Sequence, residues 1–286
     1  MTGFSGHFLE IQPRELVKYL LRAAGQYERE SVNPVDLLDL LGLAFTSFDF
    51  QLELSDDAKQ TIGGAKPRAL ISFADRLVAT DVGLSETKTR FSVLHEIGHF
   101  VLPKHQHKLF ICDDQGLTLA ARLVLEKEAS EFAADLLFLG DRFSLEANNR
   151  PLSAMTVKEL ARKYRASFEA TARRLVEKSF HECMLVVFQQ DATKAQIDDA
   201  QAPTWSVRYC VASPSFKVRY FTGVQGTVPS ETAALVAQPG RDIAESVVID
   251  VTLASPTDHS DLPFQAEFFY NRWNIFCLLT PKKPVV

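Results

Sequence analysis

Two histidines and a glutamate lie close together in the sequence, in an order that suits metal chemistry. The run reads His95-Glu96-Ile97-Gly98-His99. Residues i and i+4 of a helix share one face, so both imidazoles can reach the same ion. Glu96 lies about 100° from His95 around the helix axis, so it is better placed to act on a water molecule than to bind the ion. Two imidazoles and a carboxylate suit Zn2+, although Mn2+ or Fe2+ can replace it.

The residues around this run predict a helix that carries both histidines. Ser85 or Thr87 is suited to cap its start, and Pro103 ends it after about Val101. Gly98 lowers helix stability by up to about 1 kcal/mol. Its place in the run therefore indicates that another element approaches the helix closely there.

A third ligand must come from elsewhere, and a second predicted helix over residues 117–139 offers three glutamates. Glu126 shares a face with small residues, Ser130 among them, and small residues let two helices approach closely. Glu126 and Glu128 lie about 200° apart around the helix axis, so we expect only one of them to point inward. We prefer Glu126 as the ligand, keep Glu128 in reserve, and expect Glu128 and Glu131 to be solvated.

Together the two helices resemble those of the ImmA/IrrE family of intracellular zinc metallopeptidases. The resemblance rests on residues 90–99 (RFSVLHEIGH) and 126–137 (EKEASEFAADLL), and it covers roughly residues 15–180. It implies a zincin-like site with these metal ligands and this general base: His95, His99 and Glu126 as ligands, and Glu96 as base.

The resemblance also implies a substrate. Family members typically cleave a helix-turn-helix repressor, which relieves repression of stress, DNA-damage, phage or mobile-element genes. The chain departs from the family pattern at Ser130, where the family has Asn, and at Phe138-Leu139, where a Met-Pro pair is usual. We expect Ser130 to weaken the orientation of a metal ligand, but neither change removes a ligand.

Composition and charge narrow the classes of protein. The chain has 286 residues, a net charge of −5 and 46% hydrophobic residues, which suggests two domains with cores. This balance does not favour a nucleic-acid coat protein or a polybasic membrane binder. The N-terminus lacks a signal-peptide pattern, no stretch approaches about 18 uninterrupted apolar residues, and the four cysteines are scattered. We therefore predict a cytoplasmic protein with reduced thiols and no membrane partner.

Helical patterns before residue 180, and β-branched or aromatic runs after it, predict an α+β fold in three parts. Residues 1–150 form a mostly helical zincin-like metallopeptidase domain with a small N-terminal β-sheet. Residues 151–180 form a helix-turn-helix-like segment, and residues 181–286 form a β-rich domain. A GAF-like fold and a sensory role are options for this last domain, although it contains no ligand motif.

Local signals predict the individual elements. In the first part we expect one helix over residues 13–25 and a second that begins at Pro34 and is capped by Asn33. We also expect a strand over residues 44–50 and a hairpin that pairs residues 70–73 with 77–80. We interpret residues 143–153 as an irregular connector, Thr156 as the start of a capping box, and Ser167 as a helix cap. Beyond residue 180 we expect one helix at 231–236 and strands at 183–188, 205–211, 216–222, 246–251, 266–270 and 273–279.

The helical segment is basic, and five of its basic side chains are candidates for docking a partner: Arg162, Lys163, Arg165, Arg173 and Arg174. They could contact DNA phosphates, as in a helix-turn-helix protein, or dock the repressor substrate. The alternative is a structural helix pair with a solvated basic face. We favour this alternative, because the patch is small and the chain is acidic overall.

Three side chains are candidates for stabilising an oxyanion. His105 and His107 follow the first helix closely, and Tyr164 ends the first helix of the basic pair. The simpler interpretation of the two histidines is a solvated loop.

Two functions from different classes fit these observations. The first is a zinc-dependent endopeptidase that cleaves a helix-turn-helix repressor, with Glu96 as general base. The second is a non-catalytic regulator that binds DNA or a partner protein and uses zinc as a structural clip. We favour the enzyme, because a closed structural zinc site has no need of Glu96.

Overall fold

The computed structural model describes residues 12–53, 67–103, 105, 119–191, 204–221, 223–238, 242, 245–254 and 261–282. The chain divides into two compact units. The first comprises Met1–Phe143 and Lys163–Ala166, and the second comprises Ser144–Arg162 and Ser167–Val286. Both units combine helices and strands, so the predicted α+β class is confirmed. The predicted division at residues 150 and 180 stays a prediction.

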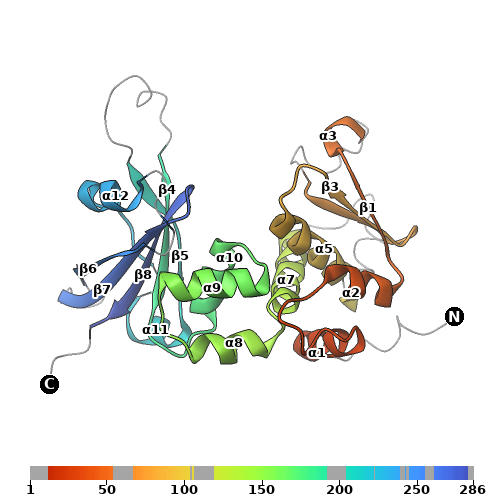
Figure 1. Ribbon diagram of the computed structural model, residues 1–286, viewed down its shortest axis with the longest axis horizontal. Helices are drawn as coiled ribbons and strands as arrows, with labels where there is room; N and C mark the ends of the chain where they lie inside the picture. Colours follow the sequence, from red (N-terminus) through yellow and green to blue (C-terminus); the bar gives the residue numbers. More distant parts are fainter. Residues whose placement is uncertain are drawn as a thin grey trace. The chain divides into compact units, whose positions relative to one another are not determined.

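The first unit contains a three-stranded sheet (Figure 1). Strand β3 (Leu77–Asp81) lies in its centre, with β2 (Ala69–Ser72) antiparallel on one side and β1 (Ala44–Phe48) parallel on the other. The predicted hairpin is therefore correct, and Arg76 adopts a positive φ of 52° in its turn. Helix α3 (Phe50–Glu53) follows β1. The sheet supplies a surface against which the next long helix packs.

Among its described residues, the first unit also has four longer helices: α1 (Pro13–Ala23), α2 (Pro34–Leu41), α5 (Glu86–Val101) and α7 (Leu119–Leu137). Asn33 caps α2 as predicted, since its side chain accepts a hydrogen bond from the backbone N–H of Val35. Helix α5 contacts β2, β3, α2 and α7. Because neighbours surround it, most of α5 is buried, and its side chains are held in fixed positions.

The second unit contains a five-stranded antiparallel sheet in the order β5-β4-β8-β7-β6 (Figure 1). Its strands are β4 (Met184–Gln190), β5 (Trp205–Ala212), β6 (Val247–Ala254), β7 (Asp261–Tyr270) and β8 (Asn274–Pro281). Helices α9 (Ala154–Tyr164) and α10 (Phe168–Glu177) precede the sheet, and Phe168 of α10 packs against Phe269 and Phe276. Five consecutive buried residues in β4 show that both of its faces are covered.

The opposite face of this sheet carries the main core of the second unit. Phe216 of α11 (Pro214–Arg219) and Val236 of α12 (Ser230–Val236) are buried there with Phe264 of β7. Trp205 belongs to the same core, whereas Trp273, at the β7–β8 turn, is 80% exposed. No helix in the described ranges is long and apolar enough to cross a membrane.

The prediction of an irregular connector at 143–153 was wrong in its first half. Residues Asp141–Asn148 form helix α8, with Phe143 and Ala147 buried one helical turn apart. Gly140, which has a φ of 62°, ends α7, and the Asn148 side chain donates to the backbone carbonyls of Ser144 and Lys178. The Gly and Asn residues that indicated a loop instead mark the ends of helices.

Two further predictions were wrong for related reasons. Of the strand expected at 216–222, the described residues 216–221 contain none, because Ser213 accepts a hydrogen bond from the Phe216 N–H and Pro214 starts helix α11. Thr156 does not cap α9. The Ser153 hydroxyl takes that role by accepting a hydrogen bond from the Thr156 N–H. In both cases a cap residue outside the expected window decided the local structure.

Candidate metal centre

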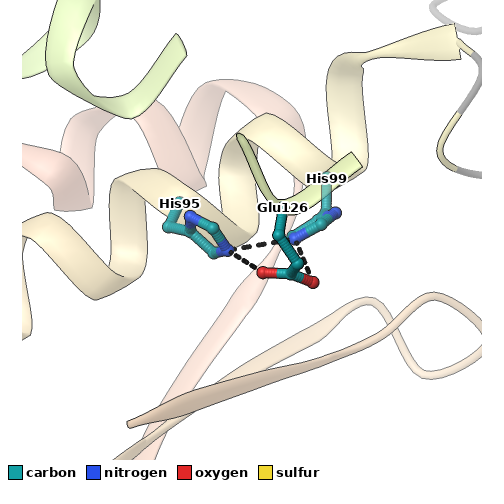
Figure 2. Close-up of side chains that lie close together, drawn as sticks. All are labelled: His95, His99 and Glu126. Carbon is teal, nitrogen blue, oxygen red and sulfur yellow. Dashed lines mark hydrogen bonds and ion pairs between the residues drawn. The ribbon is translucent and has the colours of Figure 1, made fainter. Parts of the chain in front are cut away.

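Three of the predicted side chains converge on one point (Figure 2). His95 and His99 project from α5, and the Glu126 carboxylate from α7 faces both of them. The two histidine Nε2 atoms are 3.0 Å apart. The Glu126 oxygens lie 3.1 Å from His95 Nε2 and 3.5 Å from His99 Nε2. The structure therefore brings together the two nitrogens and the carboxylate that the sequence singled out.

Close packing of α5 against α7 makes this convergence possible. A Cβ atom added to Gly98 would lie 3.2 Å from the carbonyl oxygen of Ala129 and 3.4 Å from its Cα atom. The backbone of α7 thus occupies the space that a side chain would need. This contact explains the glycine and places Glu126, one helical turn before Ser130, beside both histidines.

The donor set fits a zinc ion. Bonds of about 2.0–2.2 Å in tetrahedral geometry place neighbouring donor atoms roughly 3.3–3.5 Å apart. The separations of 3.0, 3.1 and 3.5 Å between the donor atoms are close to these values. Hydrogen bonds with His95 and His99 hold the pKa of the Glu126 carboxyl well below its usual range. This direction favours the ionised carboxylate, which is the form that binds a metal ion.

Glu96 is buried beside this cluster, with 7% of its surface exposed. Burial raises its pKa, while the charges of His95 and His99 act in the opposite direction and that of Glu126 adds to the increase. A carboxylate with a raised proton affinity is suited to accept a proton during a reaction. Its position beside the ligands agrees with the general-base role predicted from the sequence.

A second layer of contacts surrounds the two histidines. The Ser130 hydroxyl lies 3.3 Å from His95 Nδ1. His105 Nδ1 lies 2.9 Å from His99 Nδ1, and the other nitrogen of His105 lies 3.1 Å from a Glu128 oxygen. Sequence reasoning missed the His105 contacts, because Pro103 ends the helical periodicity before His105. It was also wrong to expect Glu128 to be only solvated, since long side chains on α7 reach around the helix.

The three candidates for oxyanion stabilisation have different outcomes. His105 is fully buried and contacts His99 on the ring nitrogen opposite the one that faces Glu126, so it does not point at the cluster. Burial lowers its pKa, while Glu128 acts in the opposite direction. Tyr164 is 1% exposed and packs against Phe138 and Phe143, which argues against contact with a substrate. His107 lies outside the described residues.

The basic side chains do not form one surface. Arg174 is 7% exposed, Arg165 pairs with Glu86, and Arg173 pairs with Glu177 at 2.7 Å. Lys163 lies over the ring of Tyr164, and Arg162 is exposed. Helix α10 is also tied to the sheet, since Glu169 accepts hydrogen bonds from the side chains of Tyr209 and Arg208 on β5. These contacts favour the structural interpretation of the helix pair.

A comparison with protein-family models matches the part of the chain that contains the cluster. Residues 60–176 match the family model Peptidase_M78, described as an IrrE N-terminal-like domain. This part of the chain is therefore similar to the M78 peptidase family. The matched range contains α5 and α7, with the cluster of His95, His99 and Glu126 and the neighbouring Glu96. The ImmA/IrrE resemblance inferred from the sequence is thereby confirmed.

Comparisons of whole chains add information on the fold. A search of curated protein sequences found no match. Among solved structures, a transcriptional regulator from Mycobacterium tuberculosis is similar, with a TM-score of 0.50 and 13% sequence identity. The similarity covers 93% of this chain and 86% of that chain. At this identity the similarity shows a shared fold.

Proposed function

We propose that the chain is a cytosolic zinc-dependent endopeptidase that cleaves a helix-turn-helix repressor and so relieves repression of stress, DNA-damage or mobile-element genes. The observation that carries this proposal is the convergence of His95, His99 and Glu126, with Glu96 buried beside them, inside a peptidase-family domain. The substrate class rests on the ImmA/IrrE resemblance. The similar solved structure is that of a transcriptional regulator, which agrees with a role in gene control.

The roles of the side chains follow from their positions. His95, His99 and Glu126 would hold the ion, which supplies Lewis-acid polarisation of the scissile carbonyl and of the attacking water when bound. Glu96 takes a proton from that water as general base and passes it to the leaving amine as general acid. Because Glu96 is buried, its negative charge is poorly solvated, and its affinity for the proton is raised.

The alternative of a non-catalytic DNA-binding regulator receives less support from the same side chains. Phosphate binding needs several free cations on one face, whereas Arg165 and Arg173 are paired with glutamates and Arg174 is buried. A structural zinc site would also leave Glu96 buried without a function. We therefore place repressor recognition, rather than operator binding, at the centre of the proposal.

The test is cleavage of a purified repressor. The probe is a small helix-turn-helix repressor chosen by searching the neighbouring genes, incubated with the protein and Zn2+ and analysed by mass spectrometry. We expect cleavage by the wild-type protein and by Glu131→Gln, a matched variant of an exposed α7 glutamate. Glu96→Gln should bind zinc and leave the repressor intact. Equal cleavage by Glu96→Gln would refute the mechanism, and salt-dependent operator binding without cleavage would favour the regulator.

A further inference from the structure

The contacts behind the metal cluster form a continuous chain of polar groups. His99 Nδ1 lies 2.9 Å from His105 Nδ1, and His105 Nε2 lies 3.1 Å from Glu128 Oε2. His105 is fully buried, whereas the Glu128 side chain is 44% exposed. These hydrogen bonds therefore connect the candidate ligand His99, through the buried imidazole of His105, to the partly solvated carboxylate of Glu128.

Hydrogen bonding permits only one arrangement of protons along this chain if His99 binds a metal through Nε2. The Nδ1 atom of His99 must then carry the proton, and it can donate to Nδ1 of His105 only if that nitrogen has a free lone pair. His105 in turn carries its proton on Nε2 and donates it to the Glu128 carboxylate. Each donor thus meets one acceptor, with both imidazoles neutral.

The other candidate histidine ligand, His95, is held by a weaker hydrogen bond on its second ring nitrogen. His95 binding through Nε2 places its proton on Nδ1, which faces the Ser130 hydroxyl at 3.3 Å. A hydroxyl at this distance fixes a ring less firmly than a buried imidazole at 2.9 Å that is itself anchored by a carboxylate. Helix α7 therefore supplies the ligand Glu126 and also supports both histidines, one directly through Ser130 and the other through Glu128.

We propose that His105 and Glu128 are positioning residues that hold His99 in the tautomer and orientation that bind the metal. This inference rests on the proposed metal centre and goes beyond it. Groups that hydrogen-bond a ligating histidine raise its basicity and fix its ring, and their loss typically lowers metal affinity by about 10–100-fold. The direct carboxylate partner common at metal sites is here replaced by an intervening buried histidine.

The experiment measures zinc affinity by competition with a chromophoric chelator in the full-length protein. His105→Phe preserves bulk but removes both hydrogen bonds, and we expect it to weaken zinc binding about 10–100-fold. Glu128→Gln should weaken binding less, since its amide oxygen can still accept the proton of His105, and Ser130→Ala should also have a smaller effect than His105→Phe. Glu131→Gln, on the same helix, should match the wild type.

A second measurement separates positioning from general stability. Nitrogen NMR of 15N-histidine in the zinc-loaded wild-type protein should show a proton on Nδ1 of His99 and on Nε2 of His105. The opposite tautomer at His105 would overturn the proposal, even if His105→Phe failed to fold.

Zinc affinities equal to that of the wild type in both His105→Phe and Glu128→Gln would also overturn the positioning role, while leaving the metal centre intact. A wild-type protein that binds no zinc would instead refute the metal centre and, with it, the inference built upon it. The two failures are therefore distinguishable.

Discussion

At the scale of single residues, the site illustrates what spacing can and cannot predict. The i, i+4 spacing identified His95 and His99, and the small face of the second helix identified Glu126. Helical angles alone predicted that Glu128 would turn away, yet its long side chain reaches His105. Contacts of that kind depend on where the chain beyond Pro103 returns toward α7, and the local sequence does not encode this.

The ligand assignment gives the first prediction. Replacing His99 with Ala removes a nitrogen donor and leaves the site with one histidine and one carboxylate, which is too few protein ligands for stable zinc binding. We expect bound zinc, measured by elemental analysis after dialysis, to fall from stoichiometric to near zero. Stoichiometric zinc in that variant would contradict the assignment, and Glu131→Gln serves as the control.

At the scale of elements, the cap predictions succeeded at two helices and failed at two, since Thr156 does not cap α9 and Ser85 makes no side-chain cap bond at α5. Asn33 and Ser167 cap α2 and α10 as predicted, because each side chain satisfies a backbone N–H at the helix start. Helices α8 and α11 were missed, since their sequences are short and flanked by Gly, Asn or aromatic residues that also suit loops and strands. The parallel pairing of β1 with β3 is a long-range contact that no local pattern shows.

The approach of α5 to α7 gives the second prediction. Gly98→Ala adds an atom 3.2 Å from a backbone oxygen of α7, and Gly98→Val adds two more in the same crowded space. Overpacking of this kind typically costs about 1–3 kcal/mol. We expect Val to lower the free energy of unfolding in urea by about that amount, and Ala to have a smaller effect because it gains helix propensity. A Val variant as stable as the wild type would show that the helices can move apart freely.

The cap of α10 gives the third prediction. The Ser167 hydroxyl accepts a hydrogen bond from the Ala170 N–H at 3.1 Å. Removing it in Ser167→Ala should cost about 1 kcal/mol in the free energy of unfolding. Ser167→Asp should retain the stability, because a carboxylate can accept the same bond and suits a helix N-terminus. Equal losses in both variants would rule out the cap as the source of the effect.

At the scale of the whole molecule, the candidate metal centre and the β-rich part belong to different units. All three candidate ligands lie in the first unit, whereas the five-stranded sheet and its core lie in the second. The amino-acid composition predicted an acidic protein with two cores, but it could not predict which part of the chain contains the candidate metal ligands. Two short sequence runs, at residues 90–99 and 126–137, carried that information.

Linkage between metal binding and folding gives the fourth prediction. An ion that binds the folded state alone stabilises it by about 2.7 kcal/mol when its free concentration is a hundred times its dissociation constant. We expect zinc to raise the unfolding temperature of the wild-type protein, followed by circular dichroism at the helical signal. The His99→Ala variant should show no such increase, and an equal shift in both proteins would indicate binding elsewhere.

The placement of the two tryptophans has a practical consequence for spectroscopy. Trp205 and Trp273 are the only tryptophans in the sequence, and both lie in the second unit. One is 3% exposed and the other 80% exposed, so an aqueous quencher will extinguish the emission of Trp273 before that of Trp205. Intrinsic fluorescence therefore reports on the β-rich unit without any label. A change in emission on adding zinc or a repressor would reveal that the second unit responds to events at the first.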